Sequence, residues 1–346
     1  MRIFIRAVAL FTDFGPVEVH RIYDTKDNNT VMNIIRFLKT WTLPVSMMAG
    51  GASYFIYVNM PFFAPTRPYA NAVVGVVQPV LIFSMLFLTF CKISFKEMKL
   101  KRWHLWHALI QATLFTVLAG VLIVLPMLHS RVIVESAMLC LLCPTATAAA
   151  VVTSKLGGSA ASTTTYTIII NLLVAAMAPL LLPLAHPHDG LTFLPTFNMI
   201  LHKVFPMLIC PLLAAWAVRR FCPPLHRMML KVKDLAFYLW AVALAIAIAV
   251  TVKAIVHSTV PVEYQLCIAV VSLVCCLFQF VIGKLIGRRY GEEMEGGQAL
   301  GQKNTVFIIW MGYTFLSPVT AVAGGFYSVW HNIINSWQLR KAQDRS

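Results

Sequence analysis

The sequence predicts an all-α integral membrane protein with ten transmembrane helices, arranged as two inverted repeats of five, with broken helices 4 and 9 that cross. Of its 346 residues, 59% are hydrophobic and only 12% are charged. Apolar blocks of about 20 residues, long enough to cross about 30 Å of hydrocarbon, recur along most of the chain. Inside one block, Lys303 follows a run of amides and glycines. Because a lysine is costly in lipid, it is expected to face protein or a water-filled cavity.

The formal charge of +15 would suggest a nucleic-acid partner in a soluble protein. Here most of the 28 lysines and arginines lie in short loops between apolar blocks, which is typical of topology signals instead. Their distribution predicts a multi-pass protein of the plasma (inner) membrane with both termini in the cytoplasm. On this orientation the outside loops hold only Arg67, Arg131 and Lys253. The predicted partner is the lipid bilayer, and nucleic-acid binding is excluded.

The sequence carries no familiar catalytic motif. It contains no phosphate loop, nucleophile elbow or HExxH pattern, so the chain is not expected to be an enzyme, and no cofactor is indicated. Cys140 and Cys143 form a CxxC pair inside an apolar block, with no second pair. We interpret them as small packing residues, because a structural metal site needs four ligands.

The expected elements follow the apolar blocks in order. A cytoplasmic tail at 1–35 precedes a transporter domain at 36–340, and a C-terminal tail occupies 341–346. The expected segments span about 41–59 (with Pro44, Gly50 and Gly51), 69–91 (with Pro79), 104–126 (opening His-Leu-Trp-His), 131–155 (with Pro144), 159–184 (opening with a hydroxyl-rich run), 196–219, 234–255, 262–286, 293–315 (with Lys303) and 318–339.

The segment starts repeat in two sets of five. Because five is odd, the second set must enter the membrane with the opposite orientation, which is the inverted repeat found in many secondary transporters. The fourth and ninth segments occupy corresponding positions and are both interrupted, at Pro144 and near Gly301. Interrupted segments at matching positions are the best sequence indication of a substrate site near the membrane midplane.

Polar residues in these segments form the candidate substrate or ion site. Thr145 and Thr147 accompany small alanines that let another helix cross closely. Thr163 and Thr167 share a helix face and either line the site or bond back to their own helix. The remaining candidates are the amides Gln111, Gln298, Gln302 and Asn304, together with Lys303. Gln111, Gln298 and Gln302 could form a weak cation site, but no carboxylate lies at the membrane centre, which argues against ion coupling.

Three motifs in order resemble the bile acid:sodium symporter family. They are Cys-Pro-x-x-Thr-Ala from Cys143, the hydroxyl-rich fifth segment and Gln298-x-x-x-Gln302. The resemblance covers about residues 36–340. It implies a panel domain (about 36–91 and 196–255) and a core domain (about 104–184 and 262–339). It also implies crossing segments 4 and 9 and alternating access by movement of one domain against the other.

The family's two sodium sites carry over only in part. The resemblance places the third-segment glutamine at Gln111 and the fifth-segment hydroxyls at Thr163 and Thr167. Other positions have changed: the Ser-Asn pair becomes Ala149 and Ala150, the shared glutamate becomes Gln298, and the Gln-Asn pair becomes Gln302 and Lys303. An ammonium about 4 Å from a sodium ion would repel it by roughly 4 kcal/mol at an effective dielectric of 20.

We therefore expect a secondary transporter of a small organic anion that does not use the standard two-sodium mechanism. Lys303 could replace one cation site as a fixed charge, contact the anionic substrate, or couple transport to protons. One alternative is a sodium-coupled symporter of bile acids or other organic anions. An alternative of another class is a non-transporting receptor or structural subunit on the same scaffold.

Overall fold

The computed structural model describes residues 42–93, 96–128, 130–187, 192–232, 235–258 and 260–343. The predicted N-terminal tail at 1–35 lies outside the described residues, as do 344–346 of the predicted C-terminal tail. Every named element of the described residues is helical. In chain order the elements are α3 (Thr42–Asn59), η2 (Pro61–Tyr69), α4 (Ala70–Lys92), α5 (Arg102–Val124), α6 (Arg131–Leu142), α7 (Ala148–Lys155), α8 (Ala160–Ala185), α9 (Phe193–Leu208), α10 (Cys210–Phe221), α11 (Pro223–Lys231), α12 (Leu235–Val256), α13 (Val262–Arg289), α14 (Glu293–Gly301), α15 (Thr305–Phe315) and α16 (Pro318–Gln343).

Several of these helices are long and apolar enough to cross a membrane. Among the described residues there are six such stretches: Pro61–Lys92, Arg102–Val124, Ala160–Ala185, Phe193–Phe221, Tyr238–Val256 and Val262–Arg289. Four shorter helices, α6, α7, α14 and α15, occupy the regions of the expected fourth and ninth segments. The composition and these helices together make the chain a multi-pass membrane protein.

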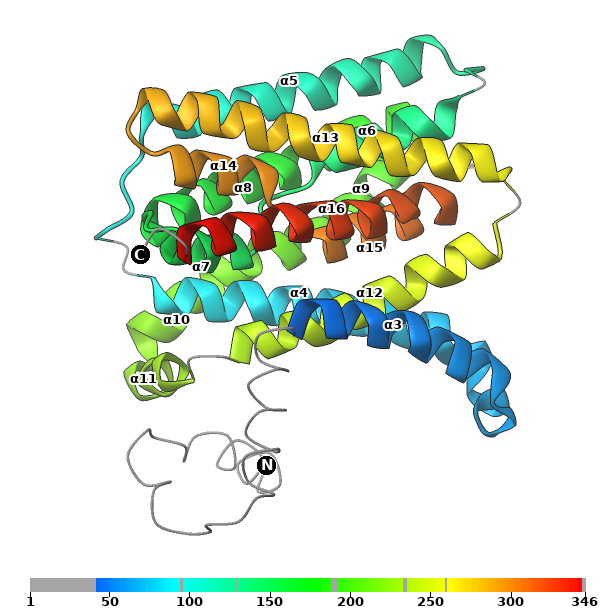
Figure 1. Cartoon of the computed structure of the whole chain (residues 1–346), viewed down its shortest axis with the longest axis horizontal. Coiled ribbons are helices and arrows are strands. Elements are labelled where there is room, and N and C mark those ends of the chain that lie inside the picture. Colours follow the sequence, from blue (N-terminus) through cyan, green and yellow to red (C-terminus); the bar gives the residue numbers. More distant parts are fainter. Residues whose placement is uncertain are drawn as a thin grey trace.

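The helices pack in two groups that lie side by side (Figure 1). In the lower group of that view, α12 packs on α3 and α4, and α10 also packs on α4. In the upper group, α13 packs along α14 and contacts α6 and α16, while α5 contacts α6 and α8. The groups meet where α12 of the lower group contacts α15 and α16 of the upper group. The helix α9 also joins them, because it packs against α8 and contacts α4 and α10. The apolar core runs through both groups, from Ile82 and Phe90 to Phe115, Tyr166 and Phe307.

The two ends of the bundle differ in their loops. The α4–α5 connection, α11 and the α13–α14 turn lie at one end, here called the basic end because Lys101, Arg219 and Arg288 are there (Figure 1). The element η2 and the α12–α13 connection lie at the opposite end. Both broken pairs, α6 with α7 and α14 with α15, have their breaks between these two ends.

Two helices of the upper group approach very closely at glycines. A Cβ atom added to Gly296 of α14 would overlap the carbonyl oxygen of Gly283 and lie 2.9 Å from the Cα of Gly287, both on α13. Only hydrogen atoms fit at this contact, so glycine on both helices sets their separation. The contact holds the half-helix α14 against the full-length helix α13.

Candidate functional site at the helix crossing

Two broken helices meet at their breaks. The helix α6 ends at Leu142 and α7 begins at Ala148, while α14 ends at Gly301 and α15 begins at Thr305. Between these ends, Thr145 and Lys303 form an isolated antiparallel bridge. The bridge joins parts of the chain that are far apart in sequence, and it creates a crossing at which four helix ends converge.

Backbone groups at the crossing pair with each other. The amide of Ala146 donates to the carbonyl of Gln302 at 2.9 Å, and the amide of Asn304 donates to the carbonyl of Pro144 at 2.9 Å. Pro144 has no amide hydrogen, so it interrupts α6–α7 without leaving an unpaired donor. Such pairing is what allows extended chain to exist at membrane depth, because lipid offers no hydrogen-bonding partner.

Lys303 lies at the centre of this crossing and is fully buried. Its Nζ donates to the Oε1 of Gln111 on α5 at 2.8 Å. No carboxylate of the described residues lies within ion-pair distance of this ammonium. The partner of the Lys303 Nζ is therefore an amide oxygen rather than an acidic side chain.

Hydrogen bonds on both sides fix the Gln111 amide. Its Nε2 donates to the carbonyls of Leu142 at 2.9 Å and Cys143 at 2.8 Å, at the end of α6. This orients Oε1 toward Lys303, and the hydroxyl of Tyr166 donates to the same oxygen at 3.2 Å. The helices α6 and α14 end at the crossing and α7 and α15 begin there, so helix ends of both partial charges lie close to Lys303.

Other predicted site residues support the backbone of the crossing. Thr145 Oγ1 donates to the carbonyl of Ala299 at 2.5 Å, which ties the first break to α14. The Oδ1 of Asn304 caps α15 by accepting from the amide of Phe307 at 3.2 Å. Gly301 packs against the ring of Phe280, and its carbonyl accepts from the Tyr327 hydroxyl at 2.8 Å. Thr147 precedes the first residue of α7, and its side chain makes no capping hydrogen bond.

The two threonines of the fifth segment bond within their own region. Thr163 Oγ1 contacts the hydroxyl of Thr153 on α7 at 3.0 Å and the carbonyl of Ser159 at 3.3 Å. Thr167 Oγ1 donates to the carbonyl of Thr163 at 3.0 Å. Of the two interpretations of these hydroxyls, the contacts favour bonding back to α8. The Thr163–Thr153 contact joins α8 to the half-helix α7.

The glutamines of the ninth segment face different surroundings. The Nε2 of Gln298 donates to Asn335 Oδ1 at 3.0 Å and Gln338 Oε1 at 3.2 Å, both on α16. Gln302 is fully buried, and neither of its amide atoms has a hydrogen-bond partner among the described residues. The structure therefore brings Gln111 to Lys303, whereas the side-chain amide of Gln298 forms its hydrogen bonds with α16. The candidate cation site of Gln111, Gln298 and Gln302 would have to compete with Lys303 for the oxygen of Gln111.

A partly buried carboxylate anchors the start of α14 at the basic end. Glu292, in the α13–α14 turn, accepts hydrogen bonds from Lys101, from the indole of Trp103 and from Ser162 Oγ, the last at 2.9 Å. Burial opposes ionisation of this carboxyl, but the three hydrogen bonds outweigh it and hold the pKa of Glu292 below its ordinary value. The half-helix that carries Lys303 is thereby joined to the first turns of α5 and α8.

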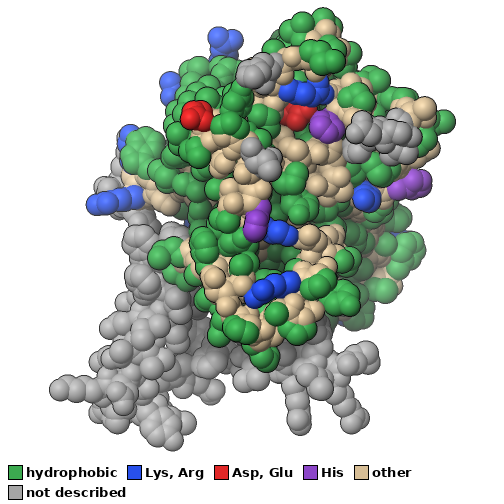
Figure 2. All heavy atoms as spheres, turned by 90° about the vertical axis from the view of Figure 1, so that its right-hand side faces the viewer, with side chains coloured by type: hydrophobic (Ala, Val, Ile, Leu, Met, Phe, Trp, Pro, Cys, Tyr) green, Lys and Arg blue, Asp and Glu red, His purple; other side chains and the backbone are tan. Residues whose placement is uncertain are grey.

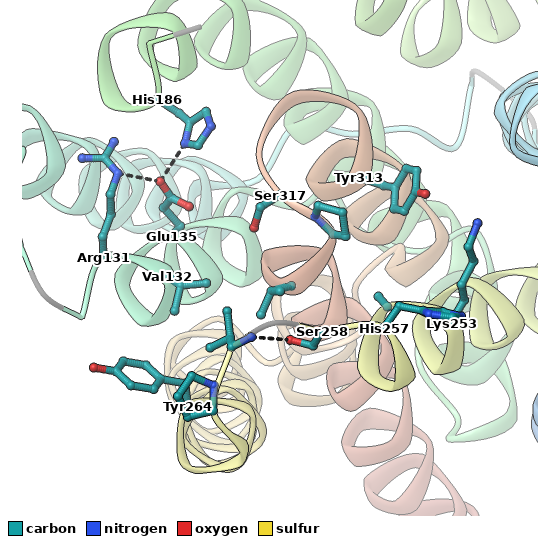
Figure 3. A pocket seen from close by; sticks show the side chains of 15 residues that line it. Arg131, Val132, Glu135, His186, Lys253, His257, Ser258, Tyr264, Tyr313 and Ser317 are labelled. Carbon is teal, nitrogen blue, oxygen red and sulfur yellow. Dashed lines mark hydrogen bonds and ion pairs between the residues drawn. The ribbon is translucent and has the colours of Figure 1, made fainter. Parts of the chain in front are cut away.

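A cavity of about 670 Å³ opens at the opposite end of the bundle (Figure 3). Charged and polar side chains from several helices line it, as does the apolar Val132; those labelled in Figure 3 are Arg131, Val132, Glu135, His186, Lys253, His257, Ser258, Tyr264, Tyr313 and Ser317. A smaller cavity of about 40 Å³ lies between α4, α12 and α15 and shares Lys253 and Tyr313 with the first. Tyr313 is eight residues after the start of α15, roughly 12 Å along the helix axis. The large cavity and Lys303 are therefore separate sites.

Sequence reasoning missed the polar face of α16. Asn335 and Gln338, together with Tyr327 and His331, are buried on α16, which packs on α13. Asn335, Gln338 and Tyr327 also make hydrogen bonds to α14. Their spacing of three or four residues is the signal that could have identified this face. The hydrogen bonds that the Glu292 carboxylate accepts cannot be inferred from sequence, because their donors come from α5, α8 and the α4–α5 loop.

No family model matches the sequence, and no curated protein matches it.

Proposed function

We propose that this chain is a secondary transporter that moves a small organic anion across the membrane by alternating access. The helix crossing is its fixed centre, and the Lys303 ammonium takes the place of a coupling cation there. In this proposal the protein uses neither of the two sodium sites of the family that it resembles. The basic end faces the cytoplasm, in keeping with the excess of lysine and arginine in its loops.

The observation that carries the proposal is the position of Lys303. A fully buried ammonium lies where two interrupted helices meet, and it donates to Gln111 at 2.8 Å. Interrupted helices that cross in a membrane protein are a common plan for binding sites of transporters. A buried charge in such a place is costly, so a charge that is kept there points to function.

Of the roles open to Lys303, the geometry favours a fixed charge. Its side chain is enclosed by protein and does not line either cavity. The oxygen of Gln111, the acceptor that a bound cation would need, is already taken by the Lys303 ammonium. The substrate therefore binds elsewhere, in the space between the two groups of helices, and the large cavity at the opposite end lies in that space.

Counterflow in proteoliposomes tests this function. Vesicles containing the purified protein are loaded with one compound at a time from a panel of carboxylates, sulfonates and uncharged analogues, and exchange with labelled external compound is measured. The proposal predicts exchange of one or more anions and none in protein-free vesicles. Exchange of uncharged or cationic compounds alone would contradict the anion preference, and binding without any exchange would favour a receptor.

A further inference from the structure

The large cavity contains two cationic groups that differ in their surroundings. Figure 3 shows Arg131, Glu135 and His186 on one side of the cavity and Lys253 with His257 on the other. The first side belongs to α6 and the chain after α8, and the second belongs to the end of α12 and the residue that follows it. The cavity thus lies between the two groups of helices. A substrate site needs this position in a transporter that works by movement of one domain against the other.

The charge of Arg131 is already neutralised. Its Nε donates to the Oε1 of Glu135 at 2.9 Å, and its remaining nitrogens donate to the carbonyls of Pro126 and Ala185. Glu135 also contacts the Nδ1 of His186 at 2.8 Å and accepts from Thr320 Oγ1 at 3.2 Å. This side of the cavity is a closed network of paired groups and leaves no charge for a ligand.

The charge of Lys253 has no such counterpart. Its one hydrogen bond within the described residues is to the Oδ1 of Asn71 on α4, at 2.6 Å, and no described carboxylate lies within ion-pair distance. Next to it, His257 contacts the hydroxyl of Tyr54 at 2.9 Å. An ammonium with a neutral partner keeps its full charge, so the electrostatic attraction of the cavity for an anion is centred on Lys253.

The rest of the cavity wall is largely apolar. Val132, Val260, Pro261, Pro318 and Val319 line it, and so do the rings of two tyrosines, Tyr264 and Tyr313. Binding pockets for small molecules combine an apolar wall with a few polar groups that fix orientation. Figure 2, which views this end of the molecule, shows basic and histidine side chains among apolar surface. The composition matches a ligand with one anionic group and an apolar body.

We propose that this cavity binds the transported organic anion, with the anionic group on the Lys253 ammonium and the apolar body against the valine, proline and tyrosine wall. That the ligand is the transported compound rests on the function proposed above. The two lysines thus have different roles: Lys253 binds the substrate charge, and Lys303 stays enclosed in the crossing. An anion held between α12 and α6 would also draw the two groups of helices together.

Thiol labelling tests the charge of the cavity without any transport. In a variant without native cysteines, Ser258→Cys places a single thiol in the cavity wall, and its reaction rates with an anionic sulfonate-bearing and a cationic ammonium-bearing methanethiosulfonate are compared. The proposal predicts a faster reaction with the anionic reagent, and a fall of this preference by about tenfold in Lys253→Met. Lys253→Arg retains the preference, and Lys203→Met, which removes a lysine outside the cavity, leaves it unchanged.

Counterflow separates the site from the function. With an anion that the wild-type protein exchanges, Lys253→Met raises the KM at least about tenfold, whereas Lys303→Met lowers exchange but keeps the labelling preference. A labelling preference unaffected by Lys253→Met overturns the site, even where transport is found. A preference that depends on Lys253 in a protein that exchanges no anion supports the site and overturns the transport function.

Discussion

The Nζ of Lys303 and the Oε1 of Gln111 lie 2.8 Å apart, both in side chains that are shielded from solvent. The bond joins the break in α14–α15 to α5, and the Nε2 of Gln111 continues it to the end of α6. The side chain of Gln111 thus bonds both to Lys303, which follows the end of α14, and to the carbonyls at the end of α6. Because no carboxylate of the described residues pairs with the ammonium, both its stability and its role depend on this amide.

Replacement of Lys303 by methionine separates a functional from a structural role. Methionine has a similar length and no charge, and Gln111 keeps the hydrogen bond from Tyr166, so we expect folded protein in normal yield. Exchange of anions should fall to the level of empty vesicles, because the fixed positive charge is lost. Size-exclusion profiles and counterflow check the two expectations, and unchanged exchange would make the lysine purely structural. Lys303→Arg, which keeps the charge, is the matched control.

Replacement of Gln111 by methionine should destabilise the protein strongly. It leaves the Lys303 ammonium buried without its acceptor, and a buried polar group left without its hydrogen-bond partner costs about 1–3 kcal/mol, and more when it is charged. In the double variant with Lys303→Met the uncompensated charge is gone, so much of the loss should be recovered. Thermal unfolding of the four proteins in detergent forms a double-mutant cycle. Additive effects of the two substitutions would contradict the coupling.

The close contact between α13 and α14 predicts a steric effect at Gly296. A Cβ atom there would overlap the carbonyl of Gly283 and press on Gly287, so Gly296→Ala should lower stability by about 1–3 kcal/mol. Gly120 on α5 is the matched control, since a Cβ at that position meets nothing within 4 Å. Gly120→Ala should leave the unfolding temperature unchanged or raise it. Equal effects of the two substitutions would show that the helices can separate at little cost.

The Glu292 carboxylate predicts a pH-dependent effect on stability. Its pKa is lower in the folded protein than its ordinary value, so its ionised form stabilises the fold above that ordinary value and this stabilisation is lost as the pH falls through the folded pKa. Glu292→Gln should cost about 1 kcal/mol at neutral pH, after allowance for partial exposure. The difference from wild type should shrink below about pH 4. A difference that stays constant across this range would rule out an ionised Glu292.

The interruptions of the helices could be predicted from single residues. Pro144 cannot donate a backbone hydrogen bond, and the lysine and glycines near residue 301 are unfavourable in a continuous apolar helix. The structure places these residues between α6 and α7 and at the end of α14. Their physical effect is local, so it can be inferred without knowledge of the neighbouring helices.

The partners of the site residues could not be predicted in the same way. Gln298 and Gln302 have the same side chain and lie four residues apart, yet one bonds to α16 and the other has no partner among the described residues. The difference depends on the break after Gly301 and on which helices pack against each residue. Lys253, expected in an outside loop, lies in the last turn of α12 and lines the cavity. Its role depends on the distances to α6 and α15, which sequence patterns do not determine.

Whether Lys303 replaces a coupling cation is tested most directly by anion uptake into proteoliposomes at neutral pH, with external sodium or with choline in its place. We expect equal uptake rates in the two solutions and loss of uptake in Lys303→Met. Uptake that is stimulated by sodium and loses this stimulation in Gln298→Ala would contradict it.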